Sequence, residues 1–150
     1  MAVIQFDTKE LRDFLNNLRA RIEKNFDSKK ALKESADFIA DLIRKRTISG
    51  RDVDLKPFES SKSGSGGSQK VNLVDTGKML DSIESRVLSN TEAVVGIFDP
   101  VQQKKAIIHQ LGLGRTPQRR FFGISNQDTV AIDHIIWIFA KQLNNAVEKI

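Results

Sequence analysis

The sequence predicts an α+β fold in a single domain, residues 1–150, and three observations point to it. Apolar residues recur at helical spacing near the N-terminus and again along the C-terminal end. Between these regions, two short runs alternate apolar and polar residues around a turn, which is typical of a β-hairpin. A chain of 150 residues is long enough to bury a core of its own. We therefore expect an N-terminal helical hairpin, a long flexible loop, a small antiparallel β-sheet and a long C-terminal helix.

Two helices are predicted before residue 50. Thr8 can cap the first, whose apolar residues share one face: Leu11, Phe14, Leu15, Leu18 and Ile22. Asp27 or Ser28 can cap the second, which runs to about Arg46. Its apolar face is broader, so we expect it to be the more buried helix; the residues concerned are Leu32, Ala36, Phe38, Ile39, Ala40, Leu42 and Ile43. The short link between them suggests an αα-hairpin.

A mobile loop is expected at about residues 50–71. The stretch SSKSGSGGSQK, residues 60–70, is dominated by Ser and Gly and has no apolar anchor. Such a segment cannot repay the entropy of ordering by burial. Two interpretations stay open: a plain flexible linker, or a loop that orders against a partner.

The middle of the chain predicts a short helix followed by a hairpin. Asp75 or Thr76 can cap a helix that buries Leu80 and Ile83, with Gly77 in its first turn. Two alternating runs follow, at residues 84–88 and 93–98, joined by a turn at residues 89–91.

The last third predicts two more helices. Asp99-Pro100 opens one, because proline suits a first helical position, and Gly112 ends it. Residues 112–123 are expected to be irregular, and Ser125 to Asp128 form a capping-box-like start to the final helix. The expected buried stripe of that helix consists of Val130, Ile135, Ile138, Phe139, Gln142, Leu143 and Val147, widened by Ile132, Ile136 and Trp137.

The sequence contains no recognisable set of catalytic, cofactor-binding or metal-binding residues. The absence of Cys removes thiolate nucleophiles, thiolate ligands and disulfides, and fits assembly in a reducing cytoplasm. His109 and His134 lie among apolar residues without metal-ligand spacing, so packing roles are favoured. No serine lies in a nucleophile elbow, and no glycine pattern fits a phosphate loop. No apolar run approaches the ~20 residues of a membrane span. The sequence thus favours a non-enzyme that works away from membranes.

Basic residues give a net charge of +5, which is compatible with an acidic partner. Arg119-Arg120 directly precede Phe121-Phe122. Basic residues beside aromatic rings can stack on single-stranded bases. The alternative, which we prefer, is that the two phenylalanines anchor the core or an interface. On extended backbone, neighbouring side chains face opposite ways, so one phenylalanine should fill the core and the other should face a different surface. The two arginines should divide similarly, and charge reversal at either should affect assembly more than folding.

Three segments then suggest a family. They are LVDTGKMLDSI at residues 73–83, AVVGIFDPVQQKKAIIHQLG at residues 93–112 and RTPQRRFFGIS at residues 115–125. Together they resemble the phage virion morphogenesis, or tail completion, family. Its members combine a TG-containing segment, a valine-rich strand, a helix closing on HQ-x-G and a P-x-R-x-FFG segment before a final helix. The resemblance covers roughly the second half of the chain and depends on the order of the segments.

The resemblance implies a structural virion protein at the head–tail junction of a tailed bacteriophage. Such a protein is expected to form a homo-oligomeric ring, six-fold by expectation, beside neck, connector and tail proteins and close to the channel DNA. The residues matching the family pattern become interface candidates: Asp75, Thr76, Gly77, His109, Gln110, Arg115, Arg119, Arg120, Phe121 and Phe122. Two alternatives stay open. One is a tail terminator that caps the tail tube, and the other is a small basic nucleic-acid-binding module.

Overall fold

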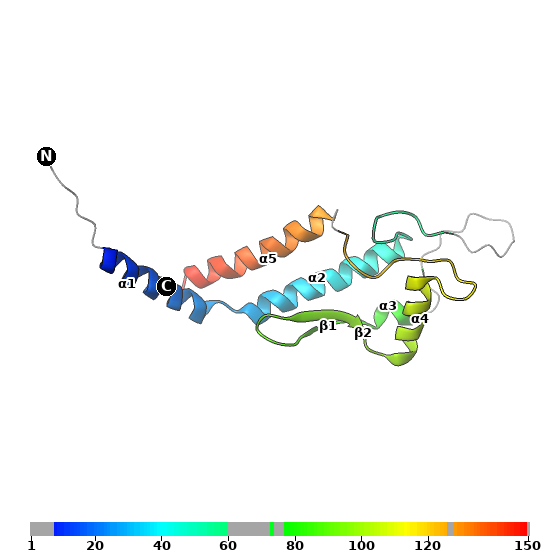
Figure 1. Ribbon diagram of the computed structural model, residues 1–150, viewed down its shortest axis with the longest axis horizontal. Coiled ribbons are helices and arrows are strands. Elements are labelled where there is room, and N and C mark those ends of the chain that lie inside the picture. The colour runs from blue at the N-terminus through cyan, green and yellow to red at the C-terminus, as the bar shows by residue number, and fades with distance from the viewer. Residues whose placement is uncertain (1–7, 60–72, 74–76, 126–127, 150) are drawn as a thin grey trace.

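The computed structural model describes residues 8–59, 73, 77–125 and 128–149 and has the expected α+β architecture (Figure 1). Five helices and one two-stranded sheet follow the predicted order within these residues: α1 Thr8–Asn25, α2 Ser28–Ile48, α3 Lys78–Asp81, β1 Ile83–Val87, β2 Ala93–Ile97, α4 Pro100–Leu111 and α5 Thr129–Val147. The strands form an antiparallel pair whose register joins Ile83 to Ile97 and Val87 to Ala93.

Helix α2 is the centre of the molecule, with the β-hairpin along one side and α5 along another (Figure 1). Asp27 caps it, as expected, by accepting a hydrogen bond from the backbone N–H of Lys30 at 2.9 Å. Small residues dominate its buried face, which consists of Ala31, Ser35, Ala36, Ala40, Ile43, Arg46 and Thr47. Since α1 has no buried residue, the prediction that the second helix is the more buried one is confirmed.

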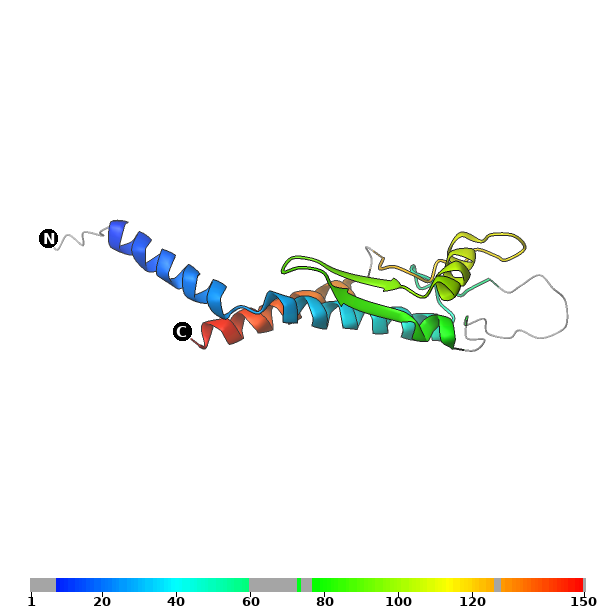
Figure 2. The same cartoon turned by 90° about the horizontal axis from the view of Figure 1, so that it is seen from below.

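Helix α1 does not fold back on α2 as the expected αα-hairpin would. It leaves the start of α2 and projects beyond the body of the molecule (Figures 1 and 2). Its contacts are made with α5, and the ring of Phe26, in the link, lies 6.5 Å from the ring of Phe139. The hairpin and α5 both pack along α2, and α1 lies outside this packing.

The short helix differs from its expected form. The expected caps Asp75 and Thr76 lie outside the described residues, and Gly77 is the N-cap itself rather than a first-turn residue. Its φ of 75° is in the left-handed region, which suits a residue without Cβ. Helix α3 ends at Asp81, so Ile83 is buried in β1 and not in a helix.

The last two helices have the expected caps with one change. Asp99 accepts a hydrogen bond from the N–H of Gln102, and Gly112 closes α4 with a φ of 68°. Helix α5 starts from Asp128 instead of Ser125, because the Asp128 carboxylate accepts from the N–H of Ala131 at 3.1 Å.

The predicted buried stripe of α5 is too wide. Only Ala131, Ile138, Gln142 and Ala146 are buried, and Ile135 and Phe139 are half-buried. The remaining predicted members are exposed: Val130, Ile132, Ile136, Trp137, Leu143 and Val147. Helices α2 and α1 both contact α5, but together they cover only a narrow strip of it, so the rest of its apolar surface has no cover within the described residues.

The core joins distant segments. Its buried members are Ala40, Ile43, Phe58, Met79, Leu80, Ile83, Ile97, Ala106 and Phe121. Part of the expected loop belongs to this packed structure. Val53 and Phe58 are buried, and Arg51 pairs with Pro57 in a β-bridge, so residues 50–59 are ordered by burial. The rest of the expected loop, residues 60–71, lies outside the described residues.

Candidate assembly surfaces

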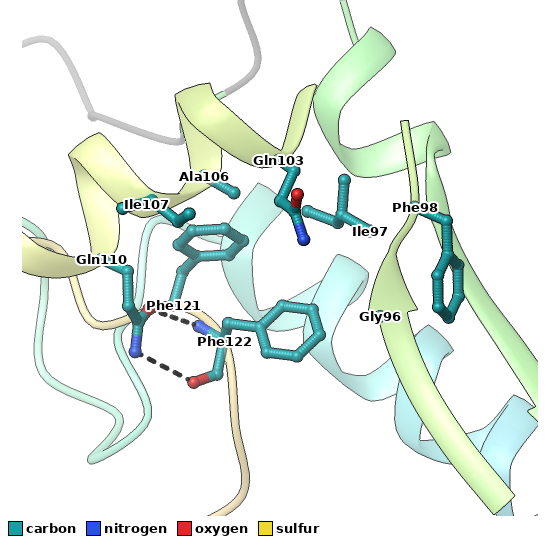
Figure 3. A pocket seen from close by; sticks show the side chains of 9 residues that line it. All are labelled: Gly96, Ile97, Phe98, Gln103, Ala106, Ile107, Gln110, Phe121 and Phe122. Carbon is teal, nitrogen blue, oxygen red and sulfur yellow. Dashed lines mark hydrogen bonds between the residues drawn. The ribbon is translucent and has the colours of Figure 1, made fainter. Parts of the chain in front are cut away.

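Phe121 and Phe122 point in different directions, as the extended backbone predicts. The Phe121 ring is fully buried beneath α4, while Phe122 is half-buried and extends toward Gly96 of β2 (Figure 3). The ring centroids are 6.0 Å apart, and the planes meet edge to face at 84°. Because Phe121 has no exposed surface, it cannot stack on a nucleic-acid base.

Gln110 holds this segment against α4. Its Oε1 accepts a hydrogen bond from the backbone N–H of Phe122 at 3.0 Å, and its Nε2 donates to the carbonyl oxygen of the same residue at 3.2 Å (Figure 3). Next to this pair lies an apolar pocket of about 320 Å³. It is lined by Gly96, Ile97, Phe98, Gln103, Ala106, Ile107, Gln110, Phe121 and Phe122.

The two arginines that precede the phenylalanines do not share one surface. Arg119 is only 5% exposed, and its guanidinium donates to the carbonyl oxygen of Glu59 at 3.2 Å. Burial lowers the pKa of this guanidinium. Arg120 is exposed and pairs with the Asp54 carboxylate at 3.2 Å. The expected division of the two arginines is therefore observed, and the burial of Arg119 gives it a role in folding.

Arg46 stabilises the fold, although in the sequence it is one of three consecutive basic residues, Arg44-Lys45-Arg46. Its side chain is buried, and Nη2 donates to the carbonyl oxygens of Phe121 and Gly123, both at 2.7 Å. Burial is the main cause that lowers its pKa, against the opposing charge of Asp128. Nothing in the sequence near Arg46 signals this contact, because its partners are more than 70 residues away.

His109 faces the interior. Its carbonyl oxygen accepts from the N–H of Arg119 at 2.7 Å, and its Nδ1 is buried without a hydrogen-bond partner among the described residues. Burial, together with the nearby positive charge of Arg119, lowers the pKa of the imidazole. The packing role expected for His109 agrees with this environment.

The remaining interface candidates do not join one site. Arg115 is exposed on the segment after α4, whereas Gly77 caps α3 and is half-buried. Asp75 and Thr76 lie outside the described residues. The structure thus brings together His109, Gln110, Arg119, Phe121 and Phe122, and leaves Arg115 and Arg120 at the surface.

A second apolar cavity was not anticipated from the sequence. This groove, of about 360 Å³, lies over α2 between β2 and α5. Its lining consists of Leu32, Ser35, Ala36, Ile39, Ile43, Ala93, Val95, Phe122, Gly123, Ile135 and Phe139. We call it the α2 groove. Phe122 lines both the α2 groove and the pocket beside α4, so it separates the two cavities.

Apolar side chains are also exposed along α1. Leu11, Phe14 and Leu15 are 54%, 61% and 52% exposed, while Leu18 and Ile22 on the same face are half-buried. The apolar face is therefore uncovered in the first half of the helix.

Other classes of site receive no support from the described residues. Among them, no cluster of three or more His, Asp or Glu side chains is placed to hold a metal ion. No helix within the described ranges has the length and apolar character needed to span a membrane.

The comparisons with known proteins return no match. The sequence matches no protein-family model and no curated protein, and the structure matches no solved structure. The family expectation therefore depends on the three sequence segments alone.

Proposed function

We propose that this chain is a non-enzymatic structural protein of a tailed bacteriophage, acting in tail completion and head–tail joining. In this proposal it forms a ring around the DNA channel at the neck of the virion. Its partners are further copies of itself and the adjacent neck, connector and tail proteins. It is made and assembled in the cytoplasm of the bacterial host.

One observation carries the assembly role. Helix α1 is an amphipathic helix of 18 residues with none of them buried, although its apolar face carries five large hydrophobic side chains. In proteins, most helix stability comes from packing an apolar face. A chain that presents such a helix and leaves the first half of its apolar face uncovered is suited to binding another protein.

The head–tail junction is suggested by the three segments that resemble the tail completion family. These segments pack against one another in one core. The first contributes Leu80 and Ile83, the second Ile97 and Ala106, and the third Phe121. Gln110, from the HQ-x-G end of the second segment, binds the backbone of Phe122 in the third. The three segments thus belong to one packed core, which supports reading them together as one family pattern.

Electron microscopy of the assembled particle tests the proposal. We expect several copies of this chain, in a closed ring, between the portal end of the head and the top of the tail. Particles made without the chain should accumulate as separate heads and tails of normal length. A single copy, or a position away from the junction, would overturn the proposal.

The two alternatives give different results. A tail terminator caps the tube, so its removal should produce tails that continue to grow. A nucleic-acid-binding module should bind DNA as an isolated monomer with a steep dependence on salt concentration. The burial of Phe121 and Arg119 weakens this second alternative, because neither side chain can reach a nucleic acid.

A further inference from the structure

We propose that the α2 groove is the docking site for α1 of a second copy of this chain. The inference rests on the proposed ring and names the contact that joins its neighbours. An amphipathic helix in an apolar groove is a recurrent mode of recognition, in which side chains at positions i, i+3, i+4 and i+7 act as anchors.

The anchors of α1 have this spacing. Leu11, Phe14, Leu15 and Leu18 stand at i, i+3, i+4 and i+7. The three exposed members lie in the first half of the helix, which points away from the rest of the chain (Figures 1 and 2). The free half of α1 therefore has the pattern of a groove-binding helix and no groove of its own within reach.

The α2 groove offers an apolar surface to these anchors. Its floor is closed by Ser35 and Ala36, which are buried, so the anchors would contact its half-buried lining, such as Leu32. Along α2, the groove runs from Leu32 to Ile43, which is roughly 16 Å at 1.5 Å per residue. The exposed anchors of α1, from Leu11 to Leu15, span roughly 6 Å at the same rise, so the groove is long enough to receive all of them.

The rim of the groove extends its apolar surface. Ile135 and Phe139 form the α5 wall of the groove. The neighbouring strip of the same helix carries three exposed apolar side chains, those of Ile132, Ile136 and Leu143. Within α5, Asp133 and Lys141 are the only charged residues. A surface poor in charge and rich in large apolar side chains fits the centre of a protein interface, and offers little to a polyanion.

The chain's own α1 is held away from the groove. At the link between α1 and α2, the Phe26 ring lies tilted against the Phe139 ring at 6.5 Å, and Asp27 caps α2. Donor helix and acceptor groove are therefore different surfaces of one molecule. Each copy gives α1 to one neighbour and accepts α1 from another, which is a heterologous contact that can close into a ring.

Disulfide trapping tests the contact. The chain has no Cys of its own, so only the introduced cysteines can form a disulfide. The full-length Leu15→Cys variant, carrying an affinity tag, is mixed with untagged Ile135→Cys protein and oxidised. The matched control acceptor is Trp137→Cys, two residues away on the opposite side of α5. A second acceptor, Ile107→Cys, reports on the pocket beside α4. Disulfides form only when the two Cα atoms come within ~7 Å, so we expect about tenfold more tagged–untagged product with Ile135→Cys than with Trp137→Cys.

Each outcome decides the proposal. Equal trapping by Trp137→Cys, preferential trapping by Ile107→Cys, or no trapping at all would overturn it. In a chain carrying both Leu15→Cys and Ile135→Cys, we expect a ladder of three or more linked chains. Products that stop at two chains would mean a reciprocal dimer, and cross-linked monomers would mean that α1 folds back on its own groove; both contradict the contact. A ring seen at the head–tail junction in particles, without trapping, would leave the proposed function in place and reject only this docking site.

Discussion

Gln110 binds Phe122 by two hydrogen bonds, one to its N–H at 3.0 Å and one to its carbonyl oxygen at 3.2 Å. The side-chain amide thus satisfies both backbone polar groups of a residue in an irregular segment. No strand pairs with that segment among the described residues. The bond pair fixes the direction of the backbone at the point where Phe121 enters the core and Phe122 lines the α2 groove.

The first prediction concerns Gln110. Replacing it in Gln110→Leu keeps the size of the side chain but leaves the part-buried N–H and carbonyl of Phe122 without partners. Such a loss costs about 1–3 kcal/mol, measured as the free energy of unfolding in urea. The control is Gln103→Leu, an exposed residue of the same helix that lines the same pocket. It should change stability by less than about 0.5 kcal/mol. Equal stability of the two variants would show that the two hydrogen bonds from Gln110 to Phe122 do not stabilise the fold.

The second prediction separates the two phenylalanines. Phe121→Ala removes a fully buried ring and should lower the free energy of unfolding by about 3–5 kcal/mol. Phe122→Ala should cost less, because the ring is half-buried, but it should weaken the α2 groove and so reduce the number of complete particles. Urea unfolding of both variants, beside a complementation assay for infectious particles, measures this. Similar stability losses for the two variants would show that the division of roles is wrong.

The third prediction separates the two arginines. Arg119→Gln loses a buried, charged donor to the carbonyl of Glu59, and we expect about 1.5–3 kcal/mol of lost stability. Arg120→Gln loses an exposed ion pair with Asp54, which is worth about 0–1 kcal/mol. Thermal unfolding of the two purified variants gives the comparison. If Arg120→Gln is the less stable protein, the burial assigned to Arg119 does not control folding.

The fourth prediction concerns pH. Burial and the charge of Arg119 lower the pKa of His109 in the folded state below its ordinary value of 6.5. The unfolded chain therefore binds a proton more readily, and protonation favours unfolding. The contribution of neutral His109 to the free energy of unfolding is complete above the pKa that it has in the unfolded chain. It is lost progressively as the pH falls from that value toward the lower pKa of the folded state.

Urea unfolding between about pH 7.5 and pH 5.5 measures this dependence, since that window brackets the ordinary pKa of histidine. The variant His109→Gln should show a flatter pH profile than the natural protein. The variant His134→Gln keeps His109 in place and shows how much of the natural slope is due to the other histidine. A natural protein whose stability is unchanged across this window would contradict the argument.

Some features of the fold could be predicted because they depend on neighbours in the chain. Asp27 and Asp99 cap their helices through N–H groups three residues further on, and Gly112 ends α4 with its own left-handed backbone. The hairpin also follows from local alternation, and its strands differ from the prediction by a single residue at their ends. The interacting groups of the caps lie within one turn, and the two strands are joined by a short turn, so the local sequence contains the cause.

Other features depend on which surfaces meet, and no local pattern contains that information. The stripe of α5 predicted Val130, Ile136 and Trp137 as buried, but the spacing of apolar residues does not say how much of a helix its neighbours cover. Arg46 stands in the basic run Arg44-Lys45-Arg46, and only the fold places the carbonyl oxygens of Phe121 and Gly123 beside it. The sequence alone determined the order of the helices, the caps of α2 and α4, and the alternation of Phe121 and Phe122. The tertiary structure decided burial, the partners of Arg46 and Gln110, and the α2 groove, because each of these joins residues that are far apart along the chain.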